Sequence, residues 1–220
     1  MKEISYKGWN YLEYAGKVPV GLVLVHQIMG LDDYAKSVAA QLSDAGYWVM
    51  AVDLFRGKHP DSFKAGMEIR DSIKKEAVQE ALSGGWHLLR ERVGSGGRIG
   101  TIGFCMGGGF ALYGACHESF DFCIDFYGMI ENVEEVERLS GPTLLMLGSL
   151  DERITPWAFS SLLPMMAKKQ KRIDIHLYPN ARHAFHQPGR EGYNAEAAKD
   201  AWSKTLRFLE DRRREAITAK

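Results

Sequence analysis

The sequence predicts an α/β fold in which helices cover both faces of a doubly wound, mostly parallel sheet. Short apolar runs rich in β-branched residues alternate with amphipathic stretches along most of the chain, which is typical of strand–helix–strand units. Most of these runs are apolar at every position, the pattern of strands that are covered on both faces. At 220 residues the chain is long enough for one large core, so we expect a single domain over residues 1–220.

The individual elements follow from the same patterns. Residues 3–16 alternate apolar and polar side chains around a turn at Lys7-Gly8, which predicts an edge hairpin. The strands expected after it are residues 18–25, 47–53, 98–104, 120–127, 142–148 and 173–178. The expected helices lie between Asp32 or Asp33 and Gly46, and over residues 76–92, 107–115, 131–139, 156–169 and 196–213.

Two further segments, the one at Pro156 and residues 54–75, also carry local signals. Pro156 is expected to open its helix, because proline suits the first helical position. Residues 54–75 are polar and irregular, and we expect them to form a loop or a short helix over the site.

Composition excludes several classes of function. The chain has 28 basic and 28 acidic residues, so no overall field favours nucleic acid or an anionic membrane. The first residues show no signal segment, and no apolar run approaches the roughly 20 residues that span a bilayer. The three cysteines have no zinc-like or redox-pair spacing. We therefore expect a cytoplasmic protein that uses no metal and no cofactor; its oligomeric state stays open.

The glycines around Cys105 indicate its chemistry. Gly103-Phe-Cys105-Met-Gly107 joins a predicted strand to a predicted helix, which is the spacing of a nucleophile elbow with cysteine in the usual serine position. Side chains two positions before and after the cysteine would collide in such a tight turn. Free N–H groups at the head of the helix then favour a thiolate. The plainer alternative is a small buried cysteine in a glycine-rich turn.

Four polar residues follow predicted strands: Gln27, Cys105, Asp151 and His183. In a parallel sheet these strand ends meet at one edge, where ligands bind. Cys105, Asp151 and His183 therefore predict a nucleophile, an acid and a base, in the chain order of α/β-hydrolases. Asp151 could instead be a turn residue. His186 is a rival to His183, which we favour because it lies just past a strand.

Each member of this triad has an expected role. His183 accepts the thiol proton and later donates it to the leaving group. Asp151 binds the other imidazole nitrogen and fixes its tautomer. The oxyanion hole is expected from the backbone N–H groups of Met106 and Ile28. His26 is expected to bond the neighbouring loop rather than to act as a second base.

With these residues in view, the chain resembles the dienelactone hydrolase family. The matching pieces are residues 27–30, 53–55, 103–108, 126–128, 148–151 and 178–185. The resemblance implies an α/β-hydrolase fold, no metal, and cleavage of a lactone or small ester through an acyl-cysteine. Carried over by position, it makes Cys105 the nucleophile, Asp151 the acid and His183 the base.

Two positions depart from the family pattern. The family has a glutamate, which helps to activate the thiol, where this chain has Gln27. It also has an arginine for the substrate carboxylate where this chain has Gln187. Arg56, Arg70 or Arg190 could replace that arginine, and a neutral ester is as plausible a substrate as a dienelactone.

The expected pocket is mostly apolar. We expect Met106 to contribute to its wall, together with the predicted substrate-binding residues Gln27, Met29, Phe55, Phe104, Tyr127, Phe185 and His186. Most of the apolar members of this set could equally belong to the core.

Three functions fit the sequence. The first is a metal-independent cysteine hydrolase of small carboxylic esters or lactones, and the second is an esterase or thioesterase of a different substrate class. The third is a catalytically idle α/β-hydrolase fold that binds a small ligand or a partner, which Gln27 favours. The reactivity of the Cys105 thiol discriminates the third from the first two.

Overall fold

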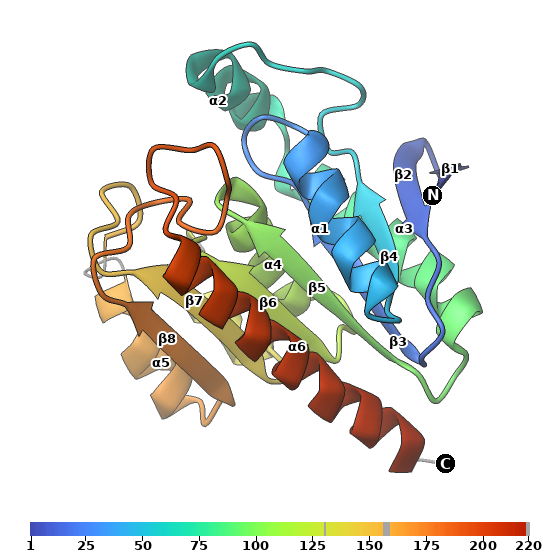
Figure 1. Ribbon diagram of the computed structural model, residues 1–220. Helices are drawn as coiled ribbons and strands as arrows, with labels where there is room; N and C mark the ends of the chain where they lie inside the picture. Colours follow the sequence, from blue (N-terminus) through green and yellow to red (C-terminus); the bar gives the residue numbers. More distant parts are fainter. Residues whose placement is uncertain (130, 156–158, 219–220) are drawn as a thin grey trace.

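The computed structural model describes residues 1–129, 131–155 and 159–218. Its centre is an eight-stranded sheet with the strand order β1-β2-β4-β3-β5-β6-β7-β8 (Figure 1). The strands are β1 (Lys2–Tyr6), β2 (Trp9–Tyr14), β3 (Val20–Val25), β4 (Trp48–Val52), β5 (Arg98–Phe104), β6 (Phe122–Phe126), β7 (Thr143–Gly148) and β8 (Ile173–Tyr178). Strands β3 to β8 are parallel, and the predicted hairpin β1–β2 joins antiparallel at one edge. The predicted fold class is therefore confirmed.

The helices form a layer on each face of the sheet. Helices α1 (Asp33–Asp44) and α6 (Ala195–Thr218) cover one face, and α3 (Lys75–Val93), α4 (Met106–His117) and α5 (Leu162–Lys168) cover the other (Figure 1). Every residue of β3 is buried, and its alternate side chains enter the two cores. This double covering explains why the strand is apolar at each position.

Several predicted helices differ in detail from the structure. The acidic stretch 131–139 contains a 3₁₀ helix, η1 (Val133–Arg138), whose Val136 is fully buried. Helix α5 begins at Leu162 in the described residues, and the predicted start at Pro156 lies outside them. Helix α6 continues to Thr218, beyond its predicted end at residue 213.

Local chemistry fixes the start of α1. The Asp32 side chain accepts a hydrogen bond from the Ala35 N–H and caps the helix, as expected. Gly46 follows the helix with a φ of +100°, a conformation that favours glycine. The helix therefore begins and ends where its capping residues dictate.

The irregular segment 54–75 contains a further helix, α2 (Phe63–Ser72). It lies above the carboxyl ends of the parallel strands in Figure 1. A Cβ at Gly66 would lie 2.3 Å from the Ile28 carbonyl oxygen, so α2 packs directly on the loop that follows β3. The expected short helix in this segment is therefore present, and it covers the loop after β3.

No helix in the described ranges is both long and apolar enough to cross a bilayer.

Candidate active site

Cys105 occupies a strained turn between β5 and α4. Its φ of +54° lies in the left-handed region, which non-glycine residues rarely adopt. A Cβ at Gly103 would lie 1.9 Å from the Gly107 carbonyl oxygen, and one at Gly107 would lie 2.3 Å from the Val25 carbonyl oxygen. The two flanking glycines are therefore a steric requirement of the turn, as the sequence predicted.

A chain of contacts joins three strand ends. His183 Nε2 lies 3.0 Å from Cys105 Sγ, and His183 Nδ1 lies 2.9 Å from Asp151 Oδ2. The other carboxylate oxygen of Asp151 accepts the N–H groups of Arg153 and Ile154. Asp151 thus holds the imidazole in one orientation and is itself held by backbone. The structure brings together the three residues that the sequence singled out.

The electrostatics of His183 favour its charged form. Burial lowers the pKa of this imidazole, but its hydrogen bonds and charge interactions with Asp151 and Cys105 outweigh burial and raise the pKa to about 9. The imidazole that favours its charged form thus lies within hydrogen-bond distance of the Cys105 sulfur.

His186, the rival base, lies elsewhere. Its Nδ1 lies 2.8 Å from the Tyr34 hydroxyl, and its ring packs among Phe104, Phe126 and Trp202. Burial lowers its pKa to about 4, so it is neutral at physiological pH. We assign it to the core beside the site.

The loop after β3 is built by His26 and Gln27. The fully buried His26 donates from Nδ1 to the Gln27 carbonyl and accepts the Leu54 N–H at Nε2, as expected of a structural residue. Burial lowers its pKa, which keeps it neutral. The Gln27 amide donates to Asp32 Oδ2 at 2.7 Å, and its carbonyl oxygen accepts the Met29 N–H. Gln27 therefore supports the helix cap of α1 rather than contacting the thiol.

The N–H groups of Ile28 and Met106 are both available at this junction. Among the described residues, neither group donates a hydrogen bond to the protein. Both residues line the same cavity as Cys105. Ile28 and Met106 therefore border the same cavity as Cys105, and their role as oxyanion donors stays a prediction.

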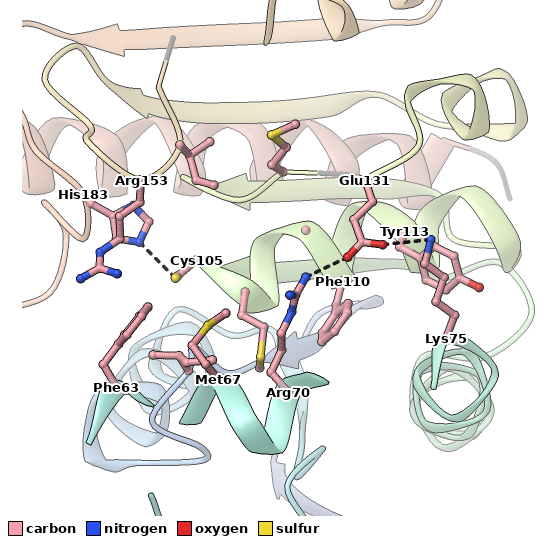
Figure 2. Close-up of a pocket in the computed structure, with 15 residues that line it drawn as sticks. Phe63, Met67, Arg70, Lys75, Cys105, Phe110, Tyr113, Glu131, Arg153 and His183 are labelled. Carbon is pink, nitrogen blue, oxygen red and sulfur yellow. Dashed lines mark hydrogen bonds and ion pairs between the residues drawn. The ribbon is translucent and has the colours of Figure 1, made fainter. Parts of the chain in front are cut away.

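Two cavities open at Cys105. The first, of about 340 Å³, runs beneath α2 and along α4 (Figure 2). The second, of about 210 Å³, lies against the loop that carries His183. Cys105, His183, Ile28, Phe63 and Arg153 line both cavities.

The predicted substrate-binding residues divide between cavity and core. Gln27 and Tyr127 line the second cavity, and the Tyr127 ring meets the His183 ring edge to face. The five residues that line neither cavity are Met29, Phe55, Phe104, Phe185 and His186. The three phenylalanines are at most 1% exposed, so they serve the core, the alternative that the sequence left open. For these five residues the predicted contact with a ligand is not supported.

Arg153 lines the site, although the sequence analysis did not name it. Arg153 lines both cavities and stacks its guanidinium over the Phe63 ring at 4.1 Å. Of the three expected candidates, Arg70 lines the first cavity, Arg190 lines the second, and Arg56 stacks on Trp9 away from both. The one signal for Arg153 was its place two residues after Asp151, in the loop that follows β7.

The described residues contain no cluster of three or more histidine, cysteine, aspartate or glutamate side chains that could hold a metal ion.

Comparison with known proteins agrees with this architecture. The family model for the dienelactone hydrolase family matches residues 11–212. Carboxymethylenebutenolidase from Pseudomonas putida is 24% identical over 220 residues, which cover 93% of each chain. The structure of a dienelactone hydrolase-like promiscuous phosphotriesterase from metagenomic libraries superposes with a TM-score of 0.83, at 20% identity over 96% of this chain and 97% of that one.

A more distant structure shares the fold alone. Pyrococcus horikoshii acylaminoacyl peptidase superposes with a TM-score of 0.71 at 17% identity, over 95% of this chain and 40% of the peptidase. The dienelactone hydrolase family model matches this chain from β2 into α6 and so covers nearly all of it. The chain therefore belongs to the dienelactone hydrolase family and is a carboxylic ester hydrolase.

Proposed function

We propose that this enzyme hydrolyses small carboxylic esters or lactones through an acyl-cysteine intermediate, with Cys105 as nucleophile, His183 as base and acid, and Asp151 as the orienting acid. One observation carries the proposal: the unbroken line of contacts from Cys105 Sγ through His183 to Asp151. The three residues follow three different strands, and only the folded sheet brings them into contact.

In the first half-reaction the Cys105 thiolate attacks the carbonyl carbon of the ester. The carbonyl electron pair moves to oxygen, and the N–H groups of Ile28 and Met106 stabilise the resulting oxyanion. As the tetrahedral intermediate collapses, the bond from carbon to the leaving oxygen breaks. The His183 imidazolium gives its proton to that oxygen, which leaves a thioester on Cys105.

In the second half-reaction water attacks the thioester. His183, now neutral, accepts a proton from that water, and the second tetrahedral intermediate expels the Cys105 thiolate. The carboxylic acid is released, and the thiolate–imidazolium pair is restored. Asp151 stabilises the imidazolium whenever it forms, because its carboxylate lies on the opposite ring nitrogen.

Gln27 fits this proposal without the activating glutamate of the family pattern. Its amide is engaged with Asp32, so it neither accepts the thiol proton nor approaches the sulfur by a hydrogen bond. Activation of the thiol falls to His183 and to the N-terminus of α4, whose first residue follows Cys105 directly. The identity of Gln27 is thus explained by the helix cap and does not imply an idle enzyme.

The test is hydrolysis of p-nitrophenyl acetate by Cys105→Ala and Cys105→Ser. We expect the alanine variant to lose turnover while its circular dichroism spectrum is unchanged. The serine variant should retain only weak activity, because an alcohol needs stronger general-base help than a thiol. Cys116→Ala is the matched control: burial raises the pKa of Cys116 to about 12, and this thiol lies outside both cavities. Full activity in Cys105→Ala would overturn the proposal.

A further inference from the structure

The two cavities leave Cys105 in different directions. The first follows one face of α4, where Met106, Gly109, Phe110 and Tyr113 recur at helical spacing. The second lies against the loop after β8, and residues 184, 187 and 190–192 of that loop line it. A substrate whose ester carbon sits on Cys105 Sγ therefore has a separate compartment for each half.

The first compartment is long and apolar. From Met106 to Tyr113 the helix rises by about 10 Å, which sets the length of the cavity along α4. Its apolar lining side chains come from several elements: Ile28, Phe63, Met67, Met106, Phe110, Tyr113, Met129 and Ile154. This surface suits an extended hydrocarbon chain.

A small, partly exposed ion network borders this compartment. Glu131 lies 2.8 Å from Arg70 and 3.3 Å from Lys75. Figure 2 shows Arg70, Glu131 and Lys75 on the side of the cavity away from Cys105 and His183, with Lys75 beside Tyr113. A chain that extends to it meets charged, solvated groups instead of apolar side chains, so further methylene groups gain little binding energy there.

His183 lines both cavities, but the loop that follows it borders only the second one. The leaving oxygen must receive its proton from His183, so the alcohol half lies on the side of the His183 loop. With the alcohol half on that side, the compartment left for the acyl chain is the first cavity, which runs along α4 from Met106.

We propose that the cavity beneath α2 is an acyl-chain subsite and that the preferred substrates are esters of medium-length, unbranched, apolar carboxylic acids with small alcohols. This inference rests on the proposed function, since it names the substrate class of that site. It differs from a preference for small polar lactones, because the subsite gives binding energy only to a substrate with an apolar chain. The Arg70–Glu131 pair sets the upper limit of chain length.

The first test compares two isomers, ethyl octanoate and octyl acetate. They contain the same atoms and the same apolar area, and they differ only in which side of the ester carries the chain. We expect ethyl octanoate to have at least a roughly tenfold higher kcat/KM, because its chain enters the acyl subsite and each fully buried methylene contributes about fourfold. Equal values, or a preference for octyl acetate, would overturn the proposal.

The second test follows p-nitrophenyl esters from acetate through butyrate and hexanoate to octanoate and dodecanoate. We expect kcat/KM to rise at least about a hundredfold from acetate to octanoate and to fall at dodecanoate. A maximum at acetate would overturn the subsite. Cys105-dependent hydrolysis of acetate in the same series tests the proposed function separately, so the two failures are distinguishable.

Two variants link the length preference to the cavity. Met67→Trp fills the subsite from α2 and should lower the octanoate-to-acetate ratio about tenfold, whereas Arg70→Met should move the maximum to a longer chain. Leu163→Trp is the control, because this exposed leucine of α5 lies outside both cavities and its substitution should leave the ratio unchanged. An unchanged ratio in Met67→Trp together with an unchanged maximum in Arg70→Met would contradict the assignment.

Discussion

His183 Nε2 lies 3.0 Å from Cys105 Sγ, although 78 residues separate the two in the sequence. The contact exists because β5 and β8 end at the same edge of the sheet and place a strained turn opposite a loop. Asp151, at the end of the intervening β7, supports the imidazole from its other nitrogen. The arrangement pairs an ionisable thiol with an imidazole that favours its charged form.

The charge of His183 predicts a specific alkaline limb in the pH profile. Because the pKa of His183 is raised to about 9, the imidazolium is present below that pH and is lost above it. An alkoxide leaving group needs this proton, so kcat/KM for an ethyl ester should fall as pH rises through about 9. A p-nitrophenyl ester is the comparison, since p-nitrophenolate leaves without a proton and should lack this limb.

Asp151→Asn is the control for that measurement. The amide cannot stabilise the imidazolium, so the limb should move to lower pH and kcat should fall by at least about a hundredfold. Profiles for the two esters that coincide up to about pH 10 would show that His183 is not the acid.

Gln27→Glu should destabilise the protein rather than activate it. In the structure the Gln27 amide donates to Asp32, the residue that caps α1. A glutamate would place two carboxylates side by side and remove the donor, which should cost about 1 kcal/mol of unfolding free energy at pH 8. Urea denaturation measures this loss, and kcat/KM should not increase.

The double variant Gln27→Glu/Asp32→Asn is the matched rescue. It restores an amide–carboxylate pair with the partners exchanged, so most of the lost stability should return. A Gln27→Glu variant that is as stable as the wild type and more active would contradict the structural role assigned to Gln27.

Asp125 makes stability depend on pH. It is fully buried, Oδ1 accepts the Gly128 N–H, and Oδ2 has no hydrogen-bond partner among the described residues. Burial raises its pKa to about 7, so between about pH 4 and pH 7 the folded state binds a proton that the unfolded state lacks. The unfolding free energy contributed by this group therefore falls as pH rises through that window.

Asp125→Asn removes this titration and keeps the acceptor for Gly128. We expect the variant to be more stable than the wild type by about 1–3 kcal/mol at pH 8 and nearly equal to it at pH 4, below the window in which Asp125 titrates. Guanidinium denaturation at both pH values measures the two differences. A difference that does not change with pH would contradict the buried, ionising state of Asp125.

Much of the fold could be read from the sequence because its signals are local. Apolar runs, the hairpin turn at Lys7-Gly8 and the cap at Asp32 are each fixed by neighbouring residues. The η1 segment was less predictable, since a short amphipathic stretch does not distinguish a 3₁₀ helix from an α-helix. The single-domain organisation and the cytoplasmic location stay predictions.

The catalytic residues of the site could be predicted from the sequence, but most of the residues around them could not. Cys105, Asp151 and His183 stand directly after strands, so the topology of a parallel sheet places them together. Phe55, Phe104 and Phe185 also stand near strand ends, and periodicity cannot say whether such a ring faces a cavity or the core. Arg153 was missed because its position depends on stacking against Phe63, a contact between distant segments.

The rate of alkylation of Cys105 by iodoacetamide as a function of pH, in the wild type and in His183→Ala, tests the central claim most directly. Only the thiolate reacts, so the rate reports how far the imidazole favours ionisation of the sulfur. The account predicts rapid alkylation at pH 6–7 in the wild type and a shift of the half-maximal rate to higher pH, by at least about one unit, in His183→Ala. Coincident rate profiles for the two proteins would contradict it.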